Sequence, residues 1–213
     1  METRLREIKA RNFPDISINV IPGHFATRHS HINYYVDLTG VLCSAKNAKA
    51  AGVALASQYA VTTPVDTIVC LDGGEAVAAF MADALTKPER RSVNAGTDIA
   101  IVTPEHNTAG QLILRDNTQR LVYGRNVIVL AAQATTGRTI DQAVDYIRYY
   151  GGNVSGICAL FSAIDVIEGF ELNALFTEKD VVGYETHEMS DCPECAAGRK
   201  IDALVNNFGY SKI

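Results

Sequence analysis

Residues 126–161, NVIVLAAQATTGRTIDQAVDYIRYYGGNVSGICALF, decide the fold. The apolar runs at 126–130 and 153–161 lack a regular polar alternation, which is typical of strands buried on both faces of a parallel sheet. Between them, residues 139–150 place apolar side chains on one helical face, namely Ile140, Val144 and Ile147. The glycine pair at 151–152 predicts the end of that helix. Strand, helix and strand together form a βαβ unit, which is almost always right-handed.

A second unit precedes this stretch. Residues 67–71 form another apolar run, which ends at Asp72-Gly73-Gly74 and continues into the Ala-rich helical pattern of residues 75–85. The two units together predict an α/β class protein, with a doubly wound parallel sheet over about residues 40–170.

The remaining segments predict smaller features. Residues 98–102 and 111–114 are expected to be the two strands of a β-hairpin, because the turn-prone sequence TPEHNTAG lies between them. Residues 1–38 contain an apolar entry, three histidines and an aromatic pair, and we expect them to form a small layer packed on the sheet.

The length of 213 residues suits one domain, or one domain with a small appendage, and the shares of 47% hydrophobic and 20% charged residues indicate a folded chain. The net charge of −5 argues against a nucleic-acid partner but leaves room for a local phosphate site. No apolar run approaches the roughly 20 residues of a membrane span, and the N-terminus lacks a signal pattern, so we expect a cytoplasmic protein with no membrane partner. Cys43, Cys70 and Cys158 lie in apolar stretches and are expected to be buried, reduced thiols.

One loop is a candidate anion site. It follows the buried strand at 126–130 and leads into a helix, so that backbone N–H groups at the helix start can bind a phosphate, and small hydroxyl side chains can add hydrogen bonds. The alternative is an ordinary loop with a threonine cap. The candidate phosphate-binding residues are Thr135, Thr136, Gly137, Arg138 and Thr139. Asp72, Gly73 and Gly74 end another strand, and ligands bind at that edge of open α/β sheets.

At this point a family resemblance becomes visible. The stretch 126–161 resembles the phosphoribosyl-diphosphate (PRPP) binding region of type I phosphoribosyltransferases, and other segments resemble orotate phosphoribosyltransferase. Those segments are Gly23-His24-Phe25, Ser30, Tyr35-Val36-Asp37, Asp72-Gly73-Gly74, Asp165, Glu168-Gly169 and the tail from Cys192 to Gly198. The resemblance implies an N-terminal hood segment (1–39), an α/β core (40–170), a C-terminal hood segment (171–213) and a homodimer. It also implies that 72–74 is a pyrophosphate loop and that Arg28 lies near the position of a hood lysine.

Three departures from the family pattern fall on the chemistry. Ala131-Ala132 stand where the family has two acidic residues, which bind the ribose hydroxyls and stabilise positive charge on the sugar. Residues 98–119, which include the predicted hairpin, contain Arg115 as their single Lys or Arg, where the family has several cations that close over the pyrophosphate. Val166 stands where the orotate enzymes have an arginine that reads the orotate carboxylate, and no apolar side chain replaces such a contact.

Three functional hypotheses follow from these residues. In the first, the protein is a catalytically impaired or divergent relative that binds a nucleotide monophosphate or a phosphosugar. In the second, it is an active enzyme that converts orotate and PRPP into orotidine monophosphate and pyrophosphate in pyrimidine biosynthesis, with Mg²⁺ as cofactor, which only PRPP binding requires. In the third, the fold performs other chemistry on a phosphorylated substrate. His106 is a candidate for donating a proton or a hydrogen bond.

No resident metal site is expected from the sequence. Cys192-Pro193-Glu194-Cys195 is half of a zinc ribbon, but a second such pair is absent from the chain. A thiol pair without function or a reversible disulfide is therefore the favoured interpretation, with a site shared across a dimer as the alternative. The histidines at 24, 29 and 31 are expected to be solvated or packed within the hood.

Overall fold

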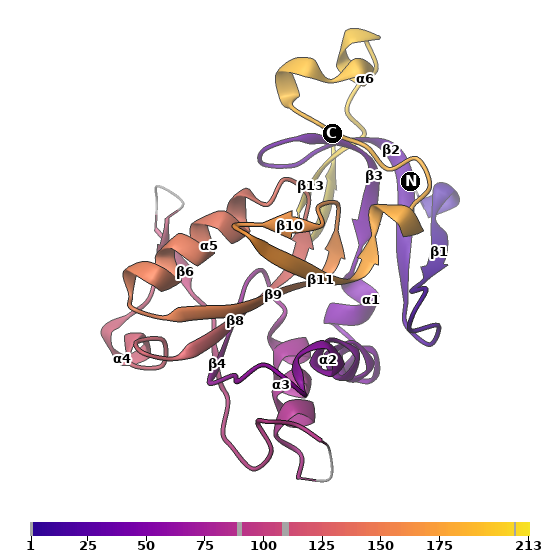
Figure 1. The fold of residues 1–213 in the computed structure, drawn as a ribbon. Helices are drawn as coiled ribbons and strands as arrows, with labels where there is room; N and C mark the ends of the chain where they lie inside the picture. Colours follow the sequence, from indigo (N-terminus) through magenta and orange to yellow (C-terminus); the bar gives the residue numbers. More distant parts are fainter. Residues whose placement is uncertain (1, 89–90, 108–110, 207) are drawn as a thin grey trace.

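The computed structural model describes residues 2–88, 91–107, 111–206 and 208–213, and it consists of a helix-flanked core sheet and a smaller second sheet (Figure 1). The core sheet has the strand order β10-β11-β9-β8-β4-β5. Its strands are β4 (Thr67–Cys70), β5 (Ala100–Val102), β8 (Asn126–Ala134), β9 (Asn153–Ser162), β10 (Val166–Ile167) and β11 (Phe170–Thr177). The pairs from β5 across to β11 are parallel, and β10 is an antiparallel addition at the edge.

Helices cover both faces of this sheet, which confirms the predicted α/β class. Apolar side chains of α2 (Ala45–Tyr59) and α3 (Glu75–Thr86) belong to one buried cluster, together with side chains from β4, β8 and β9. The apolar stripe of α5 (Arg138–Tyr149) belongs to a second cluster, which contains the alternate residues of the same strands. Since successive side chains of a strand point to opposite faces, the two clusters lie on opposite sides of the sheet.

The second sheet combines both ends of the chain, and we call it the hood. Its strand order is β12-β3-β2-β13-β14, with β1 also paired to β2. The strands are β1 (Arg6–Lys9), β2 (Ser17–Ala26), β3 (His31–Asp37), β12 (Thr186–His187), β13 (Ala203–Asn206) and β14 (Gly209–Lys212). The long antiparallel hairpin of β2 and β3 forms the centre of the hood, and its connecting loop spans residues 27–30.

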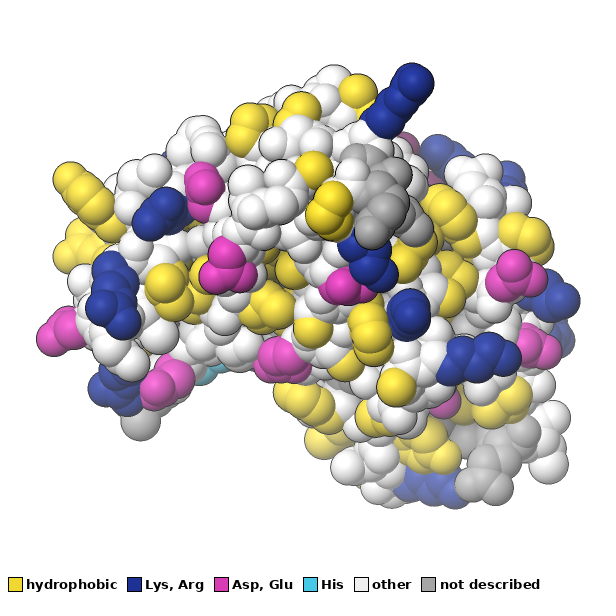
Figure 2. Space-filling model, turned by 90° about the horizontal axis from the view of Figure 1, so that it is seen from below, with side chains coloured by type: hydrophobic (Ala, Val, Ile, Leu, Met, Phe, Trp, Pro, Cys, Tyr) yellow, Lys and Arg dark blue, Asp and Glu magenta, His cyan; other side chains and the backbone are white. Residues whose placement is uncertain are grey.

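Short elements complete the chain. They are η1 (Glu2–Arg4), α1 (Thr39–Leu42), β6 (Glu105–His106), β7 (Leu112–Ile113), α4 (Asp116–Gln119), η2 (Glu178–Asp180), η3 (Met189–Asp191) and α6 (Pro193–Ala196). No helix in the described ranges is both long and apolar enough to cross a bilayer. On the face seen from below, acidic and basic side chains are interspersed (Figure 2).

Three details differ from the sequence-based predictions. The hairpin pairs β6 with β7, whereas residues 100–102 join the core sheet as β5, because their apolar side chains find a parallel partner in β4. The predicted tip includes residues 108–110, which lie outside the described residues. Cys43 is exposed, whereas Cys70 and Cys158 are buried as predicted. The core sheet extends to Thr177, beyond the predicted boundary at residue 170.

Candidate functional site

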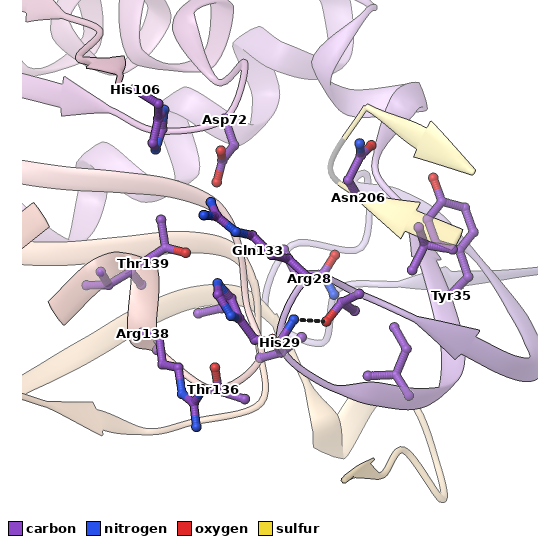
Figure 3. A pocket seen from close by; sticks show the side chains of 17 residues that line it. Arg28, His29, Tyr35, Asp72, His106, Gln133, Thr136, Arg138, Thr139 and Asn206 are labelled. Carbon is purple, nitrogen blue, oxygen red and sulfur yellow. Dashed lines mark hydrogen bonds between the residues drawn. The ribbon is translucent and has the colours of Figure 1, made fainter. Parts of the chain in front are cut away.

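A pocket of about 260 Å³ opens between the hood and the carboxyl ends of the core strands (Figure 3). Topology explains its position, because the loops that follow parallel strands converge at one edge of the sheet. Its lining comes from the β2–β3 loop, β3, β13, the loop after β4, β6, and the junction of β8 with α5.

The predicted phosphate loop forms one wall of the pocket, since all of the residues from Thr135 to Thr139 line it. Gly137 caps α5 in a left-handed conformation, with φ of 78°. A Cβ atom at this position would lie 2.6 Å from Ile167 Cδ1 and 2.8 Å from Ile164 Cδ1, so that both conformation and space call for glycine. The turn places the N-terminus of α5, with its unpaired N–H groups and positive dipole end, at the pocket wall.

Two arginines and a histidine lie beside this loop. Arg28 and His29 come from the β2–β3 loop, and Arg138 comes from the first turn of α5. Burial lowers the pKa of His29, and the nearby positive charges of Arg28 and Arg138 lower it further. Arg138 also pairs with Glu188 at 3.3 Å. The proximity of three nitrogen-bearing groups makes this side of the pocket favourable for an anion.

The opposite side of the pocket carries Asp72 and His106 (Figure 3). Asp72 adopts a left-handed backbone conformation with φ of 58°, which is uncommon outside glycine and asparagine-like residues and is often found at functional sites. Arg28 extends across the pocket toward Asp72 (Figure 3). Of the predicted pyrophosphate loop, Asp72 lines the pocket, whereas Gly73 and Gly74 form the turn into α3 behind it.

The hood supplies a more apolar wall, which the sequence did not identify as part of a site. It consists of Ile32, Tyr35, Val205 and Asn206. Tyr35 is buried, and this burial, with the neighbouring Asp37 and Tyr210, raises its pKa to about 12. Its hydroxyl therefore stays protonated at neutral pH and can donate a hydrogen bond. The burial along β3 does not alternate regularly, so no local pattern indicates that Tyr35 faces a ligand pocket.

The residues of the three departures from the family pattern all lie outside the lining of the pocket. Ala131 and Ala132 are each 1% exposed within β8, and the pocket lining begins only at the next residue, Gln133. Arg115 of the hairpin region donates from Nε to Glu105 at 3.1 Å, on the exposed surface rather than in the pocket. Val166 is exposed at the edge strand β10 and does not line the pocket.

The histidines predicted to be solvated or packed in the hood occupy different environments. His24 and His31 are buried in the hood, where their side chains meet Cys192 and Cys195. His29 instead lines the pocket.

Comparison with known proteins identifies the fold. A phosphoribosyltransferase from Corynebacterium diphtheriae superposes with a TM-score of 0.51 and 22% identity, covering 76% of this chain and 90% of that one. An orotate phosphoribosyltransferase from Aeropyrum pernix superposes with a TM-score of 0.53 and 19% identity, again covering 76% of this chain and 90% of that one. An adenine phosphoribosyltransferase from Thermoanaerobacter pseudethanolicus superposes with a TM-score of 0.50 and 17% identity, covering 83% of this chain and 96% of that one. The chain therefore has the type I phosphoribosyltransferase fold, as predicted.

Sequence comparison adds one relative. No family model matches the chain. A transcriptional regulator, GfcR, from Methanocorpusculum labreanum is 26% identical over 113 residues, which are 52% of this chain. The matched region spans 57% of the length of that regulator.

Proposed function

We propose that this protein binds a nucleoside monophosphate or a phosphosugar in the pocket and acts as a ligand-responsive regulatory protein, not as a transferase. One observation carries the proposal. The phosphate loop at 135–139 is complete and lies beside Arg28 and Arg138, whereas the adjoining positions 131 and 132 are buried alanines without any group that could assist sugar transfer.

The pocket offers distinct environments for the two ends of such a ligand. The phosphate would accept hydrogen bonds from the N–H groups at the start of α5 and from the hydroxyl of Thr136, with Arg28 supplying charge. The sugar, or a base attached to it, would then extend toward the hood wall, where Tyr35 and Asn206 can form hydrogen bonds. This order follows from the positions of the two walls, which face each other across the pocket (Figure 3).

The same arrangement argues against phosphoribosyl transfer. Departure of pyrophosphate leaves positive charge on the sugar, and a preorganised charge near that centre is worth roughly 10²–10³ in rate. The two alanines supply no such charge, and the arginine of the hairpin is engaged by Glu105. We therefore expect ligand binding to need no Mg²⁺, which would serve only if PRPP itself were bound.

A regulatory role agrees with the comparison to the transcriptional regulator, which matches about half of this chain. In this role, the protein would report a phosphorylated metabolite to a partner, through a homodimer in the cytoplasm. The net charge of −5 makes a protein partner more suitable than direct binding of nucleic acid.

Calorimetric titration with ribose 5-phosphate and a panel of nucleoside monophosphates tests the binding site. The Arg28→Gln variant should bind the preferred ligand about tenfold or more weakly, since hydrogen bonds to charged groups contribute about 1.5–3 kcal/mol. Arg125→Gln is the matched control, because Arg125 immediately precedes β8, at the end opposite the pocket. An equal loss in both variants, or no binding by the wild-type protein, would contradict the proposal.

A further inference from the structure

Four metal-ligating side chains converge in the hood, from segments that are far apart in the sequence. They are His24 of β2, His31 of β3, and the pair Cys192 and Cys195 that flanks and enters the short helix α6. Their nitrogen and sulfur atoms all lie within 4.8 Å of one another. The two histidines are brought together by the β2–β3 hairpin, and the two cysteines are brought together by one helical turn, since residues three apart share a face.

We propose that these four residues form a structural zinc site. Two thiolates and two imidazoles are a donor set that zinc prefers, and four protein ligands leave no position open for substrate. Binding would release the protons of both thiols to solvent, leaving a site with no net charge that can be buried.

Four of the six distances between ligand atoms are close to those of a tetrahedral zinc site. With Zn–N of about 2.05 Å and Zn–S of about 2.3 Å, tetrahedral zinc separates two nitrogens by about 3.3 Å and a nitrogen from a sulfur by about 3.6 Å. In the structure, His24 Nε2 lies 3.2 Å from His31 Nδ1. His24 Nε2 lies 3.5 Å from the Cys192 sulfur and 3.6 Å from the Cys195 sulfur. The Cys195 sulfur lies 3.3 Å from His31 Nδ1.

The surroundings of His24 support ligation through Nε2. Its other ring nitrogen, Nδ1, lies 3.1 Å from the carbonyl oxygen of Arg199, and an Nδ1–H donating there leaves the Nε2 lone pair free for a metal. The backbone N–H of His24 donates to the Asp202 carboxylate at 3.0 Å, and the N–H of Asp202 donates to the His24 carbonyl at 2.7 Å. Three hydrogen bonds to the C-terminal segment therefore hold this histidine in place.

The proposed zinc would tie the C-terminal segment to the hairpin that carries Arg28 and His29 into the pocket. His24 and His31 lie on either side of the loop at 27–30, and the ring centroids of the two histidines are 5.0 Å apart. The site is thus a cross-link of the hood near the pocket wall. It is inferred from its own ligands and does not depend on the proposed function.

Metal analysis of the full chain, purified under reducing conditions, tests the proposal. We expect one zinc per chain by elemental analysis. Replacement by Co²⁺ should give thiolate-to-cobalt charge-transfer absorption and the d–d bands of tetrahedral coordination. These measurements on the wild-type protein decide the question even if variants of the site fail to fold. Absence of both zinc and cobalt binding in reduced protein would overturn the proposal and leave a simple dithiol.

Matched variants assign the ligands. Cys195→Ser should weaken metal binding by at least tenfold and remove part of the charge-transfer band, whereas Cys43→Ser, which alters another exposed cysteine, should change neither. His31→Asn should also weaken binding, whereas His187→Asn, which alters a histidine paired with Glu185, should not. Equal losses in the site variants and their controls would show that the metal binds elsewhere.

Discussion

The Ala131→Asp variant tests whether an acidic side chain at position 131, where the family has an acid, could take part in sugar transfer in this protein. Ala131 lies in the middle of β8, is 1% exposed, and is paired in register with the fully buried Ala159. Its neighbours in the buried cluster are apolar. An aspartate placed here must either lose its charge or remain ionised in an apolar environment. We therefore predict that Ala131→Asp destabilises the protein instead of recreating a ribose site.

The magnitude of this effect depends on pH. Full burial raises the pKa of a carboxyl by about 3–5 units, from about 3.9 to 7 or above. Because the folded state then binds the proton more tightly than the unfolded state, stability falls as pH rises from about 4 toward the folded pKa. At about 1.36 kcal/mol per unit, this linkage costs about 4 kcal/mol at pH 7 and about 1.5 kcal/mol at pH 5.

Urea unfolding at the two pH values measures this difference, with Ala131→Asn as the control for size and polarity. The asparagine variant should show the same destabilisation at pH 5 and pH 7 relative to the wild-type protein, whereas the aspartate variant should lose about 2–3 kcal/mol more at pH 7 than at pH 5. An aspartate variant as stable as the asparagine variant at pH 7 would refute the reasoning. It would mean that a carboxylate at this position reaches the pocket and can serve a transferase.

Three other outcomes are expected. Because the pKa of His29 is lowered in the free protein, an anion bound beside it should raise that pKa, so that His29 takes up a proton when phosphate binds. Phosphate affinity should therefore rise from pH 8 to pH 6, and calorimetry in two buffers of different ionisation enthalpy should detect the proton uptake. His29→Gln should remove this pH dependence. Gly137→Ala should lower the free energy of unfolding by about 1–2 kcal/mol in urea and weaken ligand binding, since the left-handed turn disfavours a Cβ atom. Gly156→Ala should cost about 1–3 kcal/mol in the same assay through overpacking against the ring of Tyr59, while Ser155→Ala on the same strand should change stability by less.

The sequence predicted the core well because its elements are local. The apolar runs at 67–71, 126–130 and 153–161 and the amphipathic helix after the phosphate loop carry their own periodicity, and all of them form the expected structure. The position of the loop at 135–139 between a strand and a helix was predicted for the same reason, since a strand, a glycine turn and a helix are adjacent in the chain. Residues 98–102 were misassigned because an apolar run of three residues does not reveal whether its partner is a neighbouring strand or the core sheet.

The resemblance implied a hood made of both chain ends, but the residue contacts that the two ends make with each other were not predicted. The hood wall of the pocket depends on β13 reaching β2, a pairing across more than 170 residues that no local pattern reveals. The convergence of His24 and His31 with Cys192 and Cys195 also joins the two chain ends, because the cysteines lie between β12, which pairs with β3, and β13, which pairs with β2. The sequence does contain a pair of closely spaced cysteines and two nearby histidines, which are all zinc-binding residue types. These residues point to a shared metal site only when the cysteines are known to pack against the hairpin that carries the histidines.

Titration with and without Mg²⁺, followed by a search for turnover, tests the central claim most directly. The wild-type protein should bind ribose 5-phosphate or a nucleoside monophosphate with an affinity that does not change on adding Mg²⁺, and it should release no pyrophosphate from PRPP in the presence of orotate. Mg²⁺-dependent binding of PRPP, accompanied by formation of orotidine monophosphate, would contradict the account and show that the protein is an active phosphoribosyltransferase.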